Sequence, residues 1–354
     1  MRICFFSTYY PAEYPRSNKL KEAMRKAGFE IFEISEHGKN PLRYLRALSS
    51  LFANRDRYDL IFANFRSQEM FPFMLLAGKP IILDAFISMK QTIAQEKLGL
   101  KKGSIIENLI GKLEQILYRR ARLVLVDTKA HAEYFRKEYR LKNVDYIYTG
   151  ADAIFKSMKS SAPARSKSKK KTAIWYGSNQ SLHGLNSILG AAGILKDDPG
   201  ILFKLIINKK DGEELKNWAK KENMHNLIVS PPLPYAQLPK EIAAADICLM
   251  GAFGLTEKAN LVITGKTYHC LAMEKPVIIA DTKATREVFT HKKDCLIIRR
   301  GSEKEMADAI RLLACNDNLR NSIAANGFKL YSEKFDVKSV KTKLETLIAQ
   351  LPQH

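Results

Sequence analysis

Short apolar runs that alternate with amphipathic stretches constrain the fold of this chain more than any other feature. Examples of such runs are Arg2–Ser7, Pro80–Asp84 and Leu123–Asp127, and stretches with helical spacing separate them. Continuous apolar strands that alternate with helices are typical of a parallel sheet covered on both faces. The sequence therefore predicts an α/β fold.

The alternation stops once and then restarts, which indicates two domains. The segment 156–171, KSMKSSAPARSKSKKK, has seven Lys or Arg, no acid and no hydrophobic face, and apolar runs resume at Thr172. A chain of 354 residues is also long for a single core. We therefore expect two doubly wound, Rossmann-like domains that face each other across a cleft. The predicted parts are domains at 1–155 and 172–330, a basic linker at 156–171, and a helix at 331–354, for which a return to the N-terminal domain is an open option.

The charge balance indicates anionic partners. Lys and Arg number 58 against 37 Asp and Glu, a formal net charge of +21. This excess suits a membrane surface, lipid-linked phosphates, nucleotides or nucleic acid, although it also serves simply to keep a surface soluble. Neither a helix-turn-helix nor another nucleic-acid motif accompanies it, so we expect no specific nucleic acid partner.

One segment adds a membrane alternative. Ser104–Arg120 has Ile and Leu at helical spacing, and Lys101, Lys102, Lys112, Arg119 and Arg120 lie on or beside it. A basic amphipathic helix can lie on an anionic membrane, but a helix packed on the core has the same apolar stripe. The sequence leaves both interpretations open.

Several common functions lack their motifs. The loop after the first predicted strand, Ser7–Arg16, contains no Gly, which argues against a dinucleotide dehydrogenase, and no Walker A sequence occurs. The five Cys include no CxxC pair, and neither HExxH nor Asp-x-Asp occurs. We therefore expect no metal, no cofactor and a reducing, cytoplasmic location, with association to the inner face of the membrane as an option.

Two stretches of the second half carry a family resemblance. Asn226–Met250 and Thr264–Ile278, the latter TGKTYHCLAMEKPVI, resemble the family 4 glycosyltransferases, and a looser likeness covers most of the chain. The resemblance implies the GT-B fold and a hexosyltransferase-like enzyme that uses a nucleotide sugar without a metal and retains the anomeric configuration. It implies a glycan, a lipid-linked molecule or another compound as acceptor.

The strongest candidate for the donor diphosphate is the start of a predicted helix. Glycine lets the backbone approach a phosphate, lysine supplies charge, and the first turn of a helix offers free N–H groups. An ordinary N-cap with an exposed lysine is the alternative. The resemblance favours donor binding by Thr264, Gly265, Lys266 and Thr267, with Lys266 in a catalytic role.

Other candidates depart from the family pattern. The turn Gly177–Gly184 has Ser178 and His183 where relatives often have Arg and Lys, and His269 stands where a Glu reaches the ribose. Leu261 takes the place of a second Glu. The donor residues predicted from the resemblance also include Gly177, Ser178, Asn179, Lys209, Leu233, Glu257 and His269, and His183 is assigned a catalytic role.

The acceptor side has fewer candidates. Asp84 ends a predicted strand where the family often has a His near the transferred sugar, and we list it as catalytic, with a turn or N-cap Asp as the alternative. Arg16 is a candidate for an acceptor phosphate, with a surface Arg as its alternative, and Ser88 is a further acceptor candidate. Because the donor residues depart from the family, a catalytically degenerate protein that binds a glycan or a partner stays the alternative to an enzyme.

Overall fold

The computed structural model describes residues 1–8, 14–36, 38, 40–65, 67–86, 88–92, 99, 103–157 and 170–351. Most of the predicted linker 156–171 and the end of the predicted helix 331–354 lie outside these residues, as do Lys101 and Lys102. The chain forms two compact units: the first comprises Met1–Thr149 with Asp336–His354, and the second comprises Gly150–Phe335.

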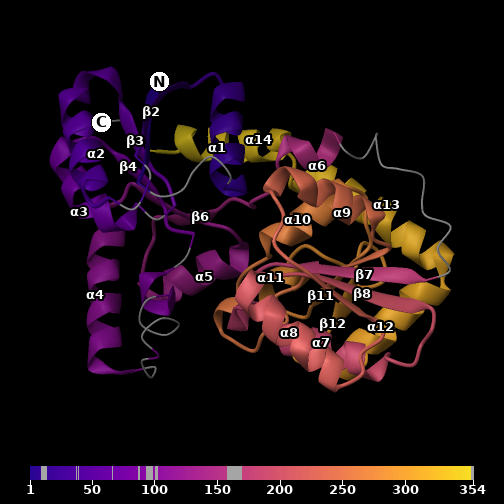
Figure 1. Cartoon of the computed structure of the whole chain (residues 1–354). Coiled ribbons are helices and arrows are strands. Elements are labelled where there is room, and N and C mark those ends of the chain that lie inside the picture. Colours follow the sequence, from indigo (N-terminus) through magenta and orange to yellow (C-terminus); the bar gives the residue numbers. More distant parts are fainter. Residues whose placement is uncertain are drawn as a thin grey trace. The chain divides into compact units, whose positions relative to one another are not determined.

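The first unit is a six-stranded parallel sheet with the order β2-β1-β3-β4-β5-β6 (Figure 1). Helices α2 to α5 cover one face of the sheet, and α1 and α14 pack on the other. The elements are β1 (Arg2–Ser7), α1 (Pro15–Lys26), β2 (Glu30–Ser35), α2 (Leu42–Ala53), η1 (Arg55–Arg57), β3 (Leu60–Ala63), η2 (Gln68–Met70), α3 (Phe71–Met74), η3 (Leu75–Ala77), β4 (Ile81–Asp84), α4 (Ile105–Arg120), β5 (Leu123–Val126), α5 (Lys129–Glu138), β6 (Val144–Tyr146) and α14 (Val337–Ala349).

The apolar strands of this unit are buried because both faces of the sheet are covered. Phe5 of β1 and Phe62 of β3 are register partners, and their rings stack at 5.4 Å. Glycines follow two of the helices: the chain leaves α1 at Gly28 and η3 at Gly78, and both glycines have positive φ, 81° and 64°. An L-residue with a side chain adopts this conformation at a cost, so glycine is favoured at these helix ends.

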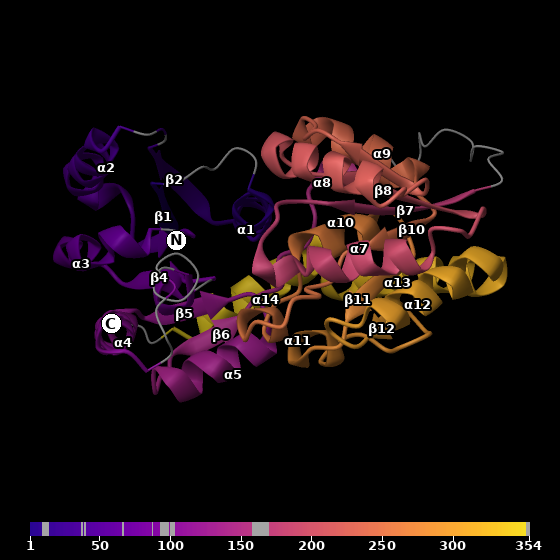
Figure 2. The same ribbon diagram turned by 60° about the horizontal axis from the view of Figure 1, so that its bottom comes forward.

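The second unit is also a six-stranded parallel sheet, with the order β12-β11-β10-β7-β8-β9 (Figure 2). The predicted α/β architecture of two Rossmann-like sheets is therefore confirmed. The elements are α6 (Ala153–Ser157), β7 (Lys171–Tyr176), η5 (Ser181–His183), α7 (Leu185–Ile194), β8 (Ile201–Ile206), α8 (Lys209–Lys221), β9 (Leu227–Ser230), η6 (Tyr235–Gln237), α9 (Leu238–Ala244), β10 (Ile247–Leu249), η7 (Lys258–Asn260), α10 (Gly265–Ala272), β11 (Val277–Ala280), α11 (Lys283–Arg286), β12 (Leu296–Ile298), α12 (Glu303–Cys315) and α13 (Asp317–Lys334).

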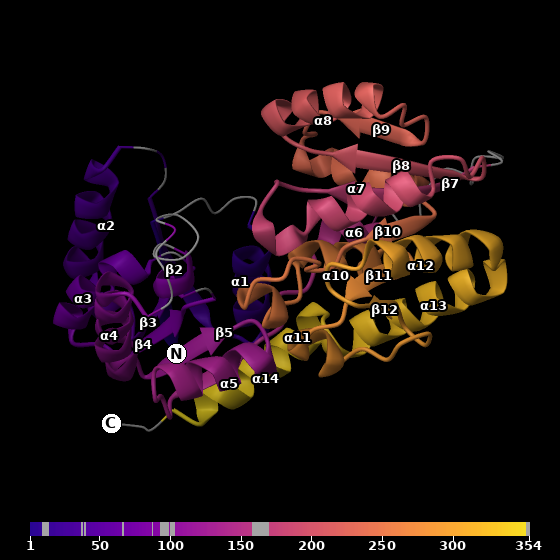
Figure 3. The same cartoon turned by 90° about the horizontal axis from the view of Figure 1, so that it is seen from below.

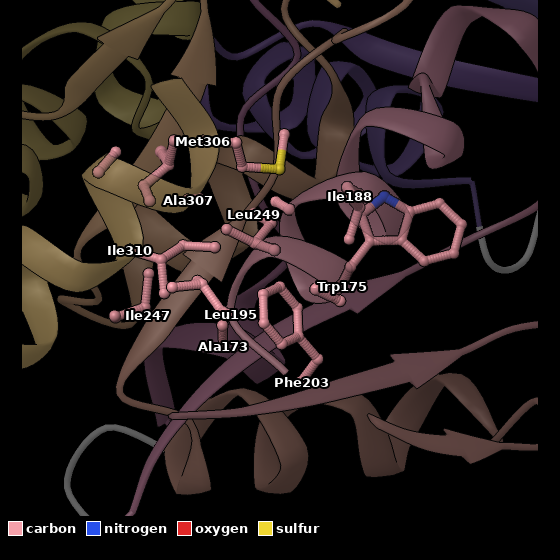
Figure 4. Close-up of a cluster of buried hydrophobic side chains, with 14 of the residues drawn as sticks. Ala173, Trp175, Ile188, Leu195, Phe203, Ile247, Leu249, Met306, Ala307 and Ile310 are labelled. Atoms are coloured by element: carbon pink, nitrogen blue, oxygen red, sulfur yellow. The ribbon is translucent and has the colours of Figure 1, made fainter. Parts of the chain in front are cut away.

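A large apolar core fixes the carboxyl end of β7. Trp175 of β7 is fully buried beside Ile188 of α7, and Leu249 and Phe203 of neighbouring strands belong to the same cluster (Figure 4). Burying a side chain of this size stabilises a fold by roughly 1.5–3 kcal/mol. The core therefore holds β7 rigidly, and the loop that follows β7 begins from a fixed point.

Among the described residues, no helix combines the length and the apolar character that crossing a membrane requires.

Candidate functional site

The turn after β7 approaches a second loop so closely that only glycine fits. Gly177 has φ 149° and Gly184 has φ 62°. A Cβ at Gly184 would lie 2.6 Å from the carbonyl carbon of Phe253, and one at Gly254 would lie 1.8 Å from the carbonyl oxygen of Ser181. The turn between β7 and α7 is therefore held against the loop that follows β10, at the carboxyl ends of two neighbouring strands.

Helix α10 begins at this place with an N-terminus that no side chain caps. Thr264, the N-cap residue, makes no side-chain cap hydrogen bond. Its hydroxyl donates to the carbonyl of Met250 instead, and the hydroxyl of Thr267 donates to the same carbonyl at 2.8 Å. The two threonines thus attach the helix to the end of β10, and its first turn contains no acidic residue to neutralise the positive end of the dipole.

Lys266 in the first turn of α10 carries a buried and unpartnered amine. The residue as a whole is partly exposed, but its Nζ is buried and has no hydrogen-bond partner among the described residues. Nζ lies 4.8 Å from the centroid of the Trp175 ring, and a Cβ at Gly177 would come within 2.4 Å of it. Desolvation lowers the pKa of this lysine to about 7. Gly177 therefore makes room for the amine, and no carboxylate of a described residue pairs with it.

His183 lies beside the same amine and is neutral. Its ring meets the Trp175 ring edge-on at 6.3 Å, and its Nδ1 is buried with no hydrogen-bond partner in the described part of the chain. Burial, followed by repulsion from Lys266 and Lys258, lowers its pKa to about 3. The indole Nε1 of Trp175 has no partner there either. Three buried nitrogen groups are thus unsatisfied at one place, and an unsatisfied buried polar group calls for an explanation.

His269 lies one turn further along α10 in an aromatic enclosure. Its ring stacks on Phe155 of α6 at 3.9 Å, and its Nδ1 is 3.0 Å from the hydroxyl of Tyr176. Burial, then repulsion from Lys266, lowers its pKa to about 3, and its Nε2 has no partner within the described ranges. A neutral imidazole with one occupied nitrogen can offer the other to a ligand.

The structure brings together one part of the predicted donor residues. Gly177, His183, Thr264, Lys266, Thr267 and His269 are joined by the contacts given above, with Gly265 as the first residue of α10. Ser178 and Asn179 follow Gly177 in the turn. Lys209 is the exposed first residue of α8, Leu233 lies half-buried before η6, and Glu257 is exposed before η7. A donor-binding role for these last three stays a prediction.

Two kinds of residue escaped the sequence analysis. Trp175 was recognised only as a strand residue, although its ring supports Lys266. Phe155 and Tyr176 enclose His269, but Phe155 precedes the basic segment by one residue and belongs to the second unit. The position of Trp175 two residues before Gly177 was an available signal, because the last residues of a strand lie next to the loop that follows it.

Arg16 and Asp84 form a buried ion pair in the first unit, which contradicts the alternative of a surface Arg. Arg16 donates from Nε to both oxygens of Asp84 at 3.0 Å and from Nη2 to Oδ1 at 2.7 Å, and it also donates to the carbonyls of Ile147 and Val126. Burial lowers the pKa of Arg16, but the charge of Asp84 outweighs it and the net shift is upward. Arg16 is therefore neither a surface residue nor an exposed phosphate ligand. The pair ties β4 to α1.

Ser88 is likewise turned inward. Its Oγ lies 2.7 Å from the hydroxyl of Tyr139 and 3.1 Å from Glu114, and its side chain is buried. These contacts occupy the hydroxyl that the sequence analysis assigned to an acceptor.

A buried pair that the sequence analysis missed follows β5. His131 Nδ1 lies 2.7 Å from Asp127 Oδ1.

Comparison with known proteins shows which family the second half of the chain resembles. Residues 157–330 match the family model described as glycosyl transferases group 1. No sequence among the curated proteins is similar enough to match the chain.

Solved structures extend the likeness to the whole chain. HepE of Anabaena in complex with UDP-glucose is 14% identical with a TM-score of 0.74, and the match covers 99% of this chain and 100% of that one. Sucrose-phosphate synthase of Thermosynechococcus elongatus is 13% identical with a TM-score of 0.75 and 99% coverage of both chains. A glycosyltransferase of Rickettsia africae is 12% identical with a TM-score of 0.65 and covers 100% of this chain and 99% of that one. At this identity the likeness shows the fold, and the predicted resemblance to a GT-B glycosyltransferase is confirmed.

Proposed function

We propose that this protein is a glycosyltransferase that moves a sugar from a nucleoside diphosphate sugar to a glycan or lipid-linked acceptor, without a metal and with retention of configuration. The observation that carries the proposal is the buried amine of Lys266, which has no hydrogen-bond partner among the described residues, at a start of α10 that no side chain caps. A buried cation without a counter-ion is unfavourable in the empty protein, so its position indicates an anionic ligand.

The chemistry follows from the charge of the leaving group. Breaking the bond between the sugar C1 and the phosphate oxygen leaves the nucleoside diphosphate with an additional negative charge. Lys266 and the N–H groups of the first turn of α10 supply positive charge where this develops, and burial makes such interactions stronger than they are in water. His183 lies within reach of the same ligand as a neutral hydrogen-bonding group.

Retention requires no strong base from the protein. In the step we propose, the departing phosphate oxygen takes the proton of the acceptor hydroxyl while the acceptor oxygen bonds to C1 on the face that the phosphate leaves. The bonding balances without a further reactant. Since Asp84 is paired with Arg16 in the first unit, we no longer assign it a catalytic role.

A uridine nucleotide is the appropriate first probe, because the HepE structures are complexes with UDP and UDP-glucose. In this chain we expect the nucleoside to extend from Lys266 toward His269, which would offer Nε2 to a ribose hydroxyl. This contact would differ from that of a carboxylate, because a neutral imidazole makes a single hydrogen bond at Nε2.

The alternative is a degenerate protein that binds without turnover, and the enclosure of His269 by Phe155 favours it. A ring stacked at 3.9 Å leaves no space between the two side chains for another group. The two functions differ in turnover but share the anion site.

Thermal unfolding with UDP and with UDP-glucose, with and without chelator, tests the proposal. A ligand at about 100 times its Kd stabilises the native state by about 2.7 kcal/mol. We expect a shift that chelator does not change, that Lys266→Met removes, and that Lys240→Met, a matched change of an exposed lysine on α9, leaves intact. UDP release from UDP-glucose measures turnover.

The outcomes separate the two functions. A shift with UDP release, supplied with a mixed acceptor panel, supports the enzyme. A shift without release supports the degenerate protein. The absence of a shift with every nucleoside diphosphate, or an unaltered shift in Lys266→Met, would contradict the assignment of the anion site.

A further inference from the structure

Helix α4 of the first unit presents its apolar side to solvent and its acidic side to the protein. Ile105, Leu109 and Ile116 are 87%, 66% and 59% exposed, and Ile106 and Leu113 are exposed as well. The two acids of the helix, Glu107 and Glu114, are buried instead. This is the reverse of an ordinary surface helix, in which the apolar stripe faces the core.

A hydrogen-bond network fixes this orientation. The carboxylate of Glu114 accepts from the backbone N–H groups of Met89 and Lys90 at 2.6 and 3.1 Å and from the hydroxyl of Tyr139 at 2.7 Å. Nζ of Lys90 lies 3.6 Å from Glu107. Rolling α4 to bury its leucines would expose these acids and break several bonds to charged groups, each worth more than a neutral one. The apolar stripe is therefore held outward.

The neighbouring helices on the same face of the sheet extend the apolar surface. Of fifteen exposed large hydrophobic residues in the described part of the chain, ten lie on α2, α3, η3 and α4. These are Leu42, Leu45, Phe52, Phe73, Leu76, Ile105, Ile106, Leu109, Leu113 and Ile116. Figure 3 shows α2, α3 and α4 together on one side of the first unit's sheet, with α1 and α14 away from them. We call this set the α2–α4 face. Exposed apolar side chains gathered in this number on one side of a unit indicate an interaction site.

The charges on the α2–α4 face indicate which kind of partner binds it. Every exposed charged residue of α4 is basic, namely Lys112, Arg119 and Arg120, and α2 contains Arg43 and Arg46 and no acid. A second copy of the chain would bring the same basic residues against these, and like charges repel. An anionic lipid surface offers apolar depth and negative charge together, which is what an amphipathic basic helix binds.

We propose that the α2–α4 face docks on an anionic membrane, with the apolar side chains of α4 in the interface between headgroups and acyl chains. The protein lies on the bilayer and does not cross it. The binding needs no nucleotide, so it is independent of the donor site and of the proposed sugar transfer.

Flotation with vesicles tests the proposal directly. Full-length protein is mixed with vesicles of phosphatidylcholine alone or with phosphatidylglycerol added, at about 0.1 M salt. We expect binding to the anionic vesicles to exceed binding to the neutral ones by roughly tenfold or more, because each basic residue near the surface contributes. The expected binding weakens as salt rises.

Two matched sets of variants separate the apolar and the basic contributions. Leu109→Gln/Leu113→Gln/Ile116→Gln should reduce binding roughly tenfold or more, because it removes apolar area. Lys112→Gln/Arg119→Gln/Arg120→Gln should reduce binding to anionic vesicles toward the level seen with neutral ones. Ile194→Gln/Ile228→Gln/Leu312→Gln changes three exposed apolar residues of the second unit and should bind like the unaltered protein.

Measurements of Tm and of self-association test whether the α4 variant loses vesicle binding for another reason. Because the α4 leucines are exposed, the α4 glutamine variant should melt like the unaltered protein, whereas side chains packed on a core would lose stability on this change. Equal vesicle binding of that variant and the unaltered protein would overturn the proposal. So would the failure of the unaltered protein to bind anionic vesicles. Sedimentation that shows a dimer dissolved by the same variant would assign the face to a second copy instead and would also overturn it.

Discussion

Replacing Lys266 with methionine should stabilise the protein while it removes nucleotide binding. Methionine keeps the length and the apolar body of the side chain over Trp175 but removes the buried ammonium, which has no hydrogen-bond partner among the described residues. An unpaired charge in a desolvated site lowers the free energy of unfolding of the protein without its ligand. Stability and function are therefore opposed at this residue.

The size of the effect follows from the pKa of Lys266. Desolvation lowers it from 10.5 to about 7. Each unit corresponds to about 1.36 kcal/mol, so the ammonium destabilises the native state by at most about 5 kcal/mol. Because the residue is partly exposed and its surroundings can relax, we expect about 1–3 kcal/mol. At neutral pH this corresponds to a rise in Tm of roughly 3–10 °C.

The pH dependence gives the sign of the effect. Below about pH 7 the lysine is protonated in the native and in the unfolded chain, and the full penalty is present. Between pH 7 and 10.5 the unfolded chain holds one more proton at Lys266 than the native protein does, so stability rises with pH. The unaltered protein should therefore gain up to about 1.36 kcal/mol per pH unit relative to Lys266→Met in this window.

The assay is urea unfolding followed by tryptophan fluorescence from pH 6 to pH 9. Both tryptophans, Trp175 and Trp218, belong to the second unit, so the signal reports on the unit that contains the site. Lys240→Met serves as the control for removing a charge. If Lys266→Met is no more stable than the unaltered protein at pH 6.5, and if the two stabilities run parallel up to pH 9, the reasoning is refuted.

Three other perturbations test separate parts of the structure. Above about pH 7 Lys266 must take up a proton to bind a diphosphate, so the affinity for UDP should fall up to about tenfold per pH unit. Calorimetry in two buffers of different ionisation enthalpy should detect the uptake of nearly one proton at pH 8.5. The absence of proton uptake would contradict a charged amine in the complex. Arg16→Met should destabilise the first unit by about 3–5 kcal/mol in denaturant unfolding, because it leaves Asp84 buried and unpaired. Arg16→Met/Asp84→Leu should recover most of this loss. A double variant as unstable as the single one would argue against the ion pair. Gly254→Ala should lower Tm and weaken UDP binding, since its Cβ would meet a carbonyl oxygen at 1.8 Å, whereas Gly193→Ala, with nothing within 4 Å of its Cβ, should do neither.

The sequence predicted the fold well because the determinants of the fold are local. Apolar runs such as Arg2–Ser7, Pro80–Asp84 and Leu123–Asp127 marked strands that the structure contains. Lys266 was predicted from its position after a glycine at a helix start. What surrounds Lys266 was not predictable, because the approach of Trp175 and His183 depends on the turn after β7 being pressed against the loop after β10.

Arg16 illustrates why the contacts of the acceptor candidates could not be predicted from the sequence. Its partner Asp84 is 68 residues away in the chain, and its further acceptors Val126 and Ile147 are more distant still. Nothing in the spacing of these residues says that they meet. A charged residue near an expected ligand site therefore looks the same in sequence whether it binds a ligand or closes an ion pair, and only the three-dimensional contacts separate the two.

Helix α4 also shows that three-dimensional contacts decide what its sequence pattern leaves open. The spacing of Ile105, Leu109, Leu113 and Ile116 defines an apolar stripe but not the direction in which it faces. The direction is set by what lies beneath the helix: backbone N–H groups at Met89 and Lys90 need acceptors, and Glu114 supplies them. Satisfying buried polar groups thus turns the polar side of α4 inward and leaves Ile105, Leu109, Leu113 and Ile116 outside, although Leu117 packs on the core. The interpretation of α4 as a helix packed on the core by its apolar stripe is wrong for this reason. Exposed leucine and isoleucine add little to the stability of the isolated unit, and the membrane docking that we propose would cover them.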